Sequence, residues 1–226
     1  MKILALETST EYCSVALWQD GNVSTQGEKV GQRHSEVLIG MLDEVLCAAN
    51  IKLAQLDGIA FGTGPGSFTG VRIACGVAQG LALGVGLPVV GVCTLHALAQ
   101  AAGHDKVLAI LDARMGEIYH AAYAKDKGTA EWMTICAPSL CLPQHAPQVE
   151  GPGWLGIGSG FALHASALQE RYAGQFSAVD AQAVPLASAI AQLAAPMLAA
   201  GGGMDPAQAR PLYLRNKVAL KTSERP

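Results

Sequence analysis

The sequence predicts an α/β protein of two lobes, each a mixed sheet with helices, and two observations support this fold class. Strand-like and helix-like segments follow one another in the order βββαβαβα over residues 2–102. A strand that ends in an acid, a short polar turn and a returning strand then occur twice, in "LALETSTEYCSVAL" and "AILDARMGEIYHAA". The two acids, Glu7 and Asp112, are 105 residues apart. We therefore expect two related lobes, residues 1–103 and 104–226.

Three strands open the predicted first lobe. The stretches "KILALETS", "YCSVALWQD" and "GNVSTQGEKV" predict an antiparallel meander with a tight turn at Asp20-Gly21. An apolar stripe in "RHSEVLIGMLDEVLCAAN" predicts a helix that Ser35 caps and Asn50 ends. A buried strand in "LDGIAFGTG", a helix rich in small residues, a strand in "LPVVGV" and a helix over 94–102 complete this lobe.

The second predicted lobe begins with the second hairpin. A strand over 131–136 and a proline-rich loop follow it, and "WLGIGSG" is typical of a strand that enters a glycine turn. Helices are expected over about 161–172 and about 185–200. The second of these is rich in alanine, and the glycines at 201–203 end it.

The charge of the chain argues against a protein that holds nucleic acid unaided, because the formal net charge is −3. Yet one third of the basic residues stand near the C-terminus, in "RPLYLRNKVALKTSERP", against Glu224 alone. They are Arg210, Arg215, Lys217, Lys221 and Arg225. The sequence leaves two alternatives open, a solvated tail or an electrostatic contact to RNA or to an acidic partner.

A cytoplasmic location is expected. The start "MKILALETS" is too short for a signal peptide, and Arg72 and Gln79 interrupt the longest apolar stretch. The six cysteines form no C-x-x-C pair, which is typical of free thiols in a reducing compartment. We therefore expect a soluble protein without a membrane span.

The segment "GTGPGSFTGVRIACGVAQGLALG", residues 62–84, raises the question of phosphate binding. It fits neither the P-loop, because it contains no lysine, nor G-x-G-x-x-G, because Ser67 and Thr69 stand at the third glycine position. An anion at the helix N-terminus and a plain helix start remain equally open.

The helix in this segment carries two stripes of small residues, each with a spacing of four that places its members on one helix face. One stripe is Gly66, Gly70, Ala74, Ala78 and Ala82, and the other is Gly76, Gly80 and Gly84. Glycine inside a helix costs about 1 kcal/mol relative to alanine, so close packing on both faces is the expected compensation. One neighbour is the chain's own sheet or helix, and the other is either a second intrachain element or another subunit.

Candidate binding residues stand at the ends of strands and in glycine turns. Glu7, Thr8, Ser9, Asp112 and Gly158 are weak candidates for holding a cofactor, and each also fits an ordinary turn. The histidines and cysteines show no metal-ligand spacing, and neither Ser67 nor Ser159 stands in G-x-S-x-G. We therefore predict no catalytic residue, metal or cofactor.

The motifs "GPGSFTGVRI" and "DARMGEIY", together with "ILALETSTEYCSVAL", "RHSEVL" and "PLYLRNKVA", resemble the bacterial TsaB family, also called YeaZ. The resemblance covers nearly the whole chain. It implies the duplicated fold of actin, sugar kinases and Hsp70, and a relationship to TsaD within that class. It also implies a non-catalytic partner that binds and activates TsaD, while the ATPase TsaE and the supplier TsaC serve the same tRNA threonylcarbamoyladenosine pathway. The resemblance thus implies that the chain contacts tRNA only as part of the complex and that the isolated protein forms a homodimer.

TsaD-like proteins carry an H-x-x-x-H metal pair in a stretch that aligns with "VCTLHALA". Thr94 and Leu98 take the two histidine positions here, and His96 stands alone. The resemblance further implies that the first-lobe helices pair with those of TsaD or of a second copy. The implied interface residues are Leu38, Met41, Leu42, Val45, Gly70, Ala74, Val77, Ala78 and Leu81.

An alternative function is an actin-like enzyme that binds a nucleotide and acts alone as an ATPase or phosphotransferase, using Glu7, Asp112 and the glycine turns. For the partner function, we expect Gly70→Leu or Ala78→Glu to abolish association with TsaD and to leave the monomer folded.

Overall fold

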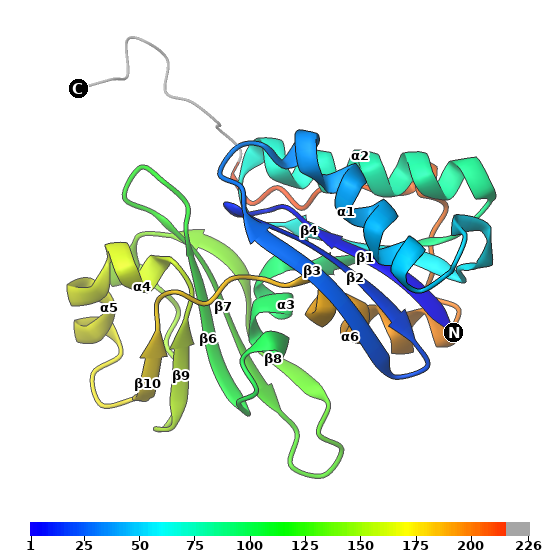
Figure 1. Cartoon of the computed structure of the whole chain (residues 1–226). Helices are drawn as coiled ribbons and strands as arrows, with labels where there is room; N and C mark the ends of the chain where they lie inside the picture. Colours follow the sequence, from blue (N-terminus) through cyan, green and yellow to red (C-terminus); the bar gives the residue numbers. More distant parts are fainter. Residues whose placement is uncertain (216–226) are drawn as a thin grey trace.

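Two five-stranded sheets form the framework of the protein in the computed structural model, which describes residues 1–215 (Figure 1). The first sheet has the order β3-β2-β1-β4-β5 and the second the order β10-β9-β6-β7-β8. The strands of the first sheet are β1 (Lys2–Glu7), β2 (Tyr12–Gln19), β3 (Asn22–Lys29), β4 (Gly58–Gly64) and β5 (Val89–Cys93). Those of the second are β6 (Lys106–Asp112), β7 (Ile118–Lys125), β8 (Trp132–Cys141), β9 (Trp154–Ile157) and β10 (Phe176–Asp180).

Both sheets have the same topology. Each begins with an antiparallel meander of three strands, and two further strands then add in parallel beside the first strand of the meander. Glu7 is the last residue of β1, and Asp112 is the last residue of β6. The internal repeat predicted from the two acids is thereby confirmed.

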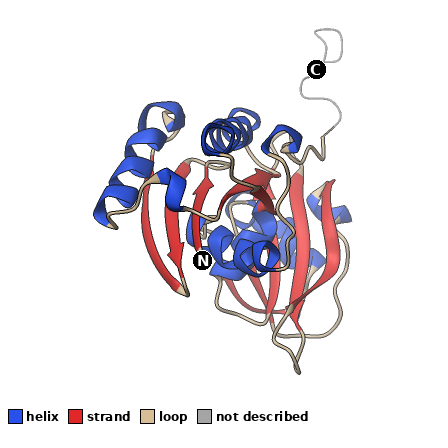
Figure 2. Cartoon of the chain, turned by 90° about the vertical axis from the view of Figure 1, so that its right-hand side faces the viewer, coloured by secondary structure: helices blue, strands red, loops and turns tan. Residues whose placement is uncertain are grey.

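Helices cover both faces of the first sheet (Figure 2). On one face lie α1 (His34–Ala48) and α2 (Phe68–Val85), and on the other lie α3 (Thr94–Ala101) and α6 (Ala187–Ala199). Alternate residues of β1 serve the two faces, because Leu4 and Leu6 pack toward α1 and α2 while Ile3 and Ala5 pack toward α6. Small side chains on both sides of the α6 contact let this helix lie close to the sheet.

The helix α3 connects the two lobes. Leu95 and Leu98 on α3 are buried in one cluster with Ala109, Tyr123 and Ile157 of the second sheet. The short helices α4 (Gly160–Leu163) and α5 (Ala165–Arg171) pack on the second lobe. An apolar core thus runs from one lobe into the other.

Several sequence-based boundaries differ from the structure. α1 begins at His34 after Arg33, so the prediction that Ser35 caps it is wrong, whereas Asn50 takes the left-handed conformation expected after a helix end. β8 continues to Cys141 through Pro138, which is tolerated because β8 is an edge strand whose register shifts there. The single helix expected over 161–172 is interrupted at His164, and β10 was not anticipated.

The chain returns to the first lobe after the second sheet. α6 packs on the first sheet, and Met204 forms a bridge with Val89 of β5. The backbone N–H of Leu212 then donates a 2.8 Å hydrogen bond to the carbonyl oxygen of Thr63. The expected division at residue 103 separates the two sheets, but α6 and the segment 204–212 lie with the first lobe.

One of the described helices, α2, has the length and the apolar composition that a bilayer span requires. Packed helices of water-soluble domains meet the same two criteria, and one face of α2 packs against β1 and β4. The expectation that the chain has no membrane span stays a prediction. All six cysteines are free thiols, with Cys13 and Cys75 buried and Cys47 exposed.

Candidate functional site

The two stripes of small residues on α2 have different surroundings. Ala74, Ala78 and Ala82 are fully buried against the chain's own core, and a Cβ atom at Gly70 would overlap the carbonyl oxygen of Thr8. Beyond its chain neighbours and the backbone of its own helix, a Cβ atom at Gly76, Gly80 or Gly84 would meet no atom of the described chain within 4 Å. The first stripe therefore serves intrachain packing, and the second faces open space.

The glycine loop before α2 packs against the turn between β1 and β2. The Glu7 carboxylate occupies the space beside Gly62 that a side chain there would fill, and Ser9 does the same beside Gly66. The backbone N–H of Ser67 donates to the carbonyl oxygen of Ser9 at 2.7 Å, and the Ser67 hydroxyl accepts from the Gly70 N–H. The helix N-terminus thus finds its partners within the chain, which favours the plain helix start over anion binding.

Glu7, Thr8 and Ser9 are buried in this packed turn. The Glu7 carboxylate accepts hydrogen bonds from the Ser9 N–H and, at 3.4 Å, from the Thr94 hydroxyl. Burial raises the pKa of Glu7 above its ordinary value of 4.5, although these hydrogen bonds act in the opposite direction. The Thr8 hydroxyl donates to the carbonyl oxygen of Gly70 at 2.7 Å. The three residues thereby hold the turn and the helix together.

Thr94 and Leu98, which align with the metal-binding histidines of TsaD-like proteins, take part in hydrogen bonding and core packing in this chain. The Thr94 hydroxyl accepts from the Gly64 N–H at 3.1 Å, and Leu98 lies in the core between the lobes. The His96 ring stacks on Tyr123 with a 4.7 Å centroid separation, and burial lowers the pKa of His96 to about 4. Among the described residues, no group of three or more His, Cys, Asp or Glu side chains is placed to hold a metal ion.

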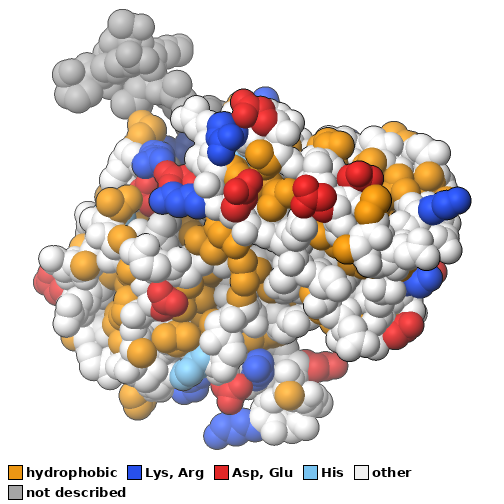
Figure 3. Space-filling view, in the orientation of Figure 1, with side chains coloured by type: hydrophobic (Ala, Val, Ile, Leu, Met, Phe, Trp, Pro, Cys, Tyr) orange, Lys and Arg blue, Asp and Glu red, His pale blue; other side chains and the backbone are white. Residues whose placement is uncertain are grey.

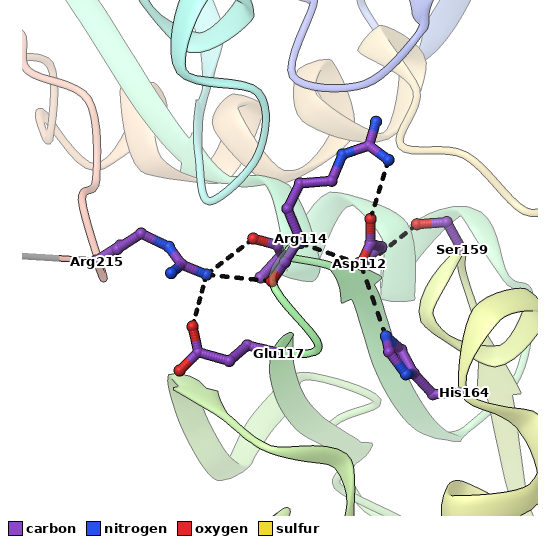
Figure 4. A network of polar contacts seen from close by, with 7 residues as sticks. Asp112, Arg114, Glu117, Ser159, His164 and Arg215 are labelled. Carbon is purple, nitrogen blue, oxygen red and sulfur yellow. Dashed lines mark hydrogen bonds and ion pairs between the residues drawn. The ribbon is translucent and has the colours of Figure 1, made fainter. Parts of the chain in front are cut away.

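Asp112 lies in a polar network at the end of β6 (Figure 4). Its carboxylate is 3.4 Å from the Arg114 guanidinium and 3.6 Å from Nε2 of His164. The Ser159 hydroxyl accepts a 3.1 Å hydrogen bond from the Asp112 backbone N–H. A nucleophilic triad needs the histidine between the serine and the acid, but Ser159 contacts the backbone of Asp112 and His164 faces its carboxylate. The network is therefore a turn support. Gly158 instead packs closely on β6, because a Cβ atom there would collide with the Ile110 carbonyl oxygen.

Arg215 joins the C-terminal segment to the turn between β6 and β7 (Figure 4). Its guanidinium donates to the Ala113 carbonyl oxygen at 2.9 Å and pairs with Glu117 at 2.7 Å. Because Leu212 is bonded to Thr63 of the first lobe, residues 212–215 connect the two lobes. The sequence gives no sign of this role, because Arg215 stands in a run of basic residues that has no periodic pattern. Lys217, Lys221 and Arg225 of the same run lie outside the described residues.

The sequence of the chain matches the protein family described as "TsaD: tRNA N6-adenosine threonylcarbamoyltransferase" over residues 24–222. The "tRNA threonylcarbamoyladenosine biosynthesis protein TsaB" of Escherichia coli is 38% identical over 229 residues, which cover 98% of this chain and 97% of that protein. The protein of the same name from Haemophilus influenzae is 35% identical, with coverage of 98% and 96%. The chain belongs to the TsaB family.

Solved structures agree with this family. The structure described as "YeaZ from Pseudomonas aeruginosa" has a TM-score of 0.86 and 38% identity, and the match covers 94% of this chain and 99% of that one. A second Pseudomonas aeruginosa structure, described as similar to the peptidase YeaZ, has a TM-score of 0.87 and 37% identity, with coverage of 95% and 99%. The resemblance to the TsaB family and the two-lobed actin-like α/β fold predicted from it are both confirmed.

The structure places most of the interface residues implied by the TsaB resemblance inside the first lobe. Seven of them are buried in its core, and two more are partly buried. The buried set is Leu38, Met41, Leu42, Val45, Gly70, Ala74 and Ala78, and the partly buried pair is Val77 and Leu81. A partner that approaches these helices would instead meet Ile39 and Gly40 on α1, and Gly80 and Leu83 on α2, which are all exposed.

Proposed function

We propose that this chain is a non-catalytic subunit that binds a TsaD-type threonylcarbamoyltransferase and activates it in the formation of threonylcarbamoyladenosine in tRNA. Membership of the TsaB family supports a role in this pathway, because the relatives from Escherichia coli and Haemophilus influenzae are named for threonylcarbamoyladenosine biosynthesis. In this proposal the chain meets tRNA within the complex and works in the cytoplasm. TsaE and TsaC act in the same pathway, and a second copy of the chain takes the place of the transferase when the chain is alone.

The observation that carries this proposal is the open stripe of Gly76, Gly80 and Gly84 on α2. These glycines lower the stability of the helix, and a Cβ atom built on them would meet no atom of another described element within 4 Å. A helix of another subunit can approach such a face more closely than one with larger side chains. α1 lies on the same side of the sheet as α2 and contacts it, so a partner that approaches this side can meet both helices (Figure 1).

The surface over the helices of the first lobe combines apolar and acidic side chains (Figure 3). Ile39 and Leu83 are exposed on α1 and α2, and Glu36, Asp43 and Glu44 are exposed along α1. An apolar centre with a charged rim is typical of a specific protein interface. We therefore expect the partner to present small or apolar residues opposite α2 and basic residues opposite α1.

The non-catalytic part of the proposal is supported by the positions of the weak cofactor candidates. Glu7, Thr8 and Ser9 are buried in the contact between the β1–β2 turn and α2, and Asp112 supports its own turn. The alternative is an actin-like enzyme that binds a nucleotide and acts alone. Calorimetric titration of the isolated chain with ATP and Mg²⁺ separates the two, because the alternative requires micromolar binding and the proposal does not.

The cellular experiment uses a strain depleted of its own TsaB-type protein, with threonylcarbamoyladenosine content of total tRNA as the readout. The wild-type chain should restore the modified nucleoside. Gly80→Glu should fail to restore it, because the substitution places a long charged side chain in the open stripe. Ser166→Glu is the matched control, since it adds the same side chain at an exposed position of α5 in the second lobe. Equal restoration by Gly80→Glu and the control would contradict the proposed interface.

A further inference from the structure

At the start of α2, on the outside of the molecule, a guanidinium is stacked on one aromatic ring and a second ring lies tilted beside them. Phe68 is 40% exposed and Tyr213 is 47% exposed, with ring centroids 5.9 Å apart. The guanidinium carbon of Arg72 lies 3.6 Å from the Phe68 centroid and 5.6 Å from that of Tyr213. Arg72 Nε also donates a 2.7 Å hydrogen bond to the Tyr213 hydroxyl. The three side chains therefore form one ordered unit that water still reaches.

The turn between β6 and β7 is joined to the same C-terminal segment that supplies Tyr213. Arg114 is 80% exposed, and it and Met115 take left-handed backbone conformations with φ of 62° and 58°. Such conformations are uncommon for residues of this size, so the contacts around the turn must maintain them. Arg215, two residues after Tyr213, donates to the Ala113 carbonyl oxygen and to Sδ of Met115. Arg215 thereby ties the turn to the segment that carries Tyr213, and Arg114 stays largely exposed although it pairs with Asp112 at 3.4 Å.

The charge of the chain is concentrated toward this end. Residues 206–226 contain five basic residues and one acid, which gives this segment a net charge of +4. Because the whole chain has a net charge of −3, the preceding 205 residues have a net charge of −7. The segment of the sequence that contains Tyr213 and Arg215 is thus basic in a chain that is acidic as a whole. A local excess of positive charge is the electrostatic pattern expected of a segment that meets a polyanion.

We propose that Phe68, Arg72, Tyr213, Arg114 and Met115, named here the head surface, bind an unpaired stretch of RNA. Bases stack on the exposed aromatic rings and on the Arg72 plane, and phosphates contact Arg114. RNA fits better than an acidic protein segment, because carboxylates need only the guanidinium groups and leave the exposed rings unused. The proposal rests on the proposed function, in which the RNA is the tRNA that the complex modifies.

The test measures binding of fluorescein-labelled single-stranded RNA of about 12 nucleotides, a length within the range of single-strand binding sites. The full chain is used alone and in complex with the TsaD-type subunit, and duplex RNA of the same length serves as a comparison. We expect the double variant Phe68→Ala/Tyr213→Ala to weaken single-strand binding by about tenfold, because each stacked base contributes appreciably to affinity. Leu163→Ala, which truncates an exposed apolar side chain in the second lobe, is the control.

A second variant tests the phosphate contact without disturbing the stack. Arg114→Asn removes the charge, and asparagine tolerates the left-handed conformation well. It should reduce the slope of log affinity against log salt by about 0.7, the amount expected for one contact to single-stranded nucleic acid. Lys127→Gln, at an exposed position in the turn between β7 and β8, should leave the slope unchanged.

Two results would overturn the proposal. In the first, the wild-type complex does not bind single-stranded RNA. In the second, the double variant binds single-stranded RNA as tightly as the control does; if it then also fails to capture the TsaD-type subunit, the head surface is a protein-docking site. Capture of the subunit by a variant that has lost RNA binding supports the head surface separately from the α2 interface.

Discussion

The Thr8 hydroxyl donates a 2.7 Å hydrogen bond to the carbonyl oxygen of Gly70, and the carbonyl oxygen of Thr8 occupies the space that a side chain at position 70 would need. This contact fixes the N-terminal part of α2 on the β1–β2 turn. It also means that Gly70→Leu should destabilise the folded chain, and Ala78→Glu should do the same because Ala78 is fully buried. The expectation that these two variants leave the monomer intact is therefore replaced by one based on the open stripe.

Substituting alanine at Gly70 and at Gly80 should have opposite effects on stability. Gly70→Ala forces backbone to move and should lower the free energy of unfolding by about 1–3 kcal/mol. Gly80→Ala adds a methyl group in open space and should raise it by up to about 1 kcal/mol, because alanine is the better helix former. Urea unfolding of the two purified variants beside the wild type measures both. A stabilised Gly70→Ala, or a clearly destabilised Gly80→Ala, would show that the two stripes are wrongly assigned.

His120 should make the protein lose stability in acid. The Tyr172 hydroxyl donates to the Pro147 carbonyl oxygen at 2.7 Å, so it accepts the 2.9 Å hydrogen bond from Nε2 of His120, and the neutral ring therefore carries its proton on Nε2. Burial lowers the pKa of His120 to about 4 from an ordinary value of 6.5. Between these two values the unfolded chain binds a proton that the folded chain does not. Stability therefore falls as pH falls from about 6.5 to about 4.

The His120→Gln variant isolates this effect, because glutamine does not titrate and its amide can still donate to Tyr172. The wild type should lose up to about 3 kcal/mol relative to the variant across the window. His96, whose pKa is also lowered, cancels in the comparison. The measurement is the free energy of unfolding at several pH values between 4 and 7. A difference that stays constant with pH would contradict the buried neutral histidine.

Glu7→Gln should reveal a pH dependence of stability that is opposite in sign to the one caused by His120. Burial raises the pKa of Glu7, so the folded chain keeps a proton that the unfolded chain releases above about pH 4.5. The stability that the protonated form supplies is therefore lost as pH rises through the raised pKa. The variant cannot ionise, and its stability relative to the wild type should increase with pH over this interval. Parallel stability curves for the two proteins would show that Glu7 ionises in the fold as easily as in the unfolded chain.

Arg215→Ala should loosen the connection between the C-terminal segment and the second lobe. The variant loses the hydrogen bond to Ala113 and the ion pair with Glu117. Amide hydrogen exchange should become faster in residues 113–117, while the first sheet stays protected because its contacts are unchanged. Arg210→Ala, at an exposed position earlier in the same segment, is the control. Identical exchange at the β6–β7 turn in both variants would mean that Arg215 does not hold it.

The sequence predicted the arrangement of elements better than their contacts. Hydrophobic periodicity and the repeated acid at each strand end were sufficient for the two lobes, because period and position are local properties of the chain. The same periodicity could not decide which small-residue stripe of α2 is covered, since both have a spacing of four. The answer depends on the β1–β2 turn, where Thr8 contacts Gly70 although the two residues are 62 positions apart in the sequence.

The head surface and the Arg215 contacts were likewise beyond prediction. Phe68 and Tyr213 are more than 140 residues apart, and nothing in either local stretch indicates that Arg72 lies between them. α6 was placed in the second lobe because it follows the second sheet in sequence, whereas its alanine-rich face packs on Ala5, Ala16 and Ala60 of the first. Contacts between segments that are far apart in the sequence produce no periodic pattern in it.

The central claim is that the open stripe on α2 receives another subunit. Sedimentation velocity of the purified chain mixed with a purified TsaD-type subunit tests it most directly, with Gly80→Glu and Ser166→Glu measured beside the wild type. We predict a heterodimer for the wild type and for Ser166→Glu, and separate monomeric species for a correctly folded Gly80→Glu. A heterodimer of undiminished affinity with Gly80→Glu would contradict the account.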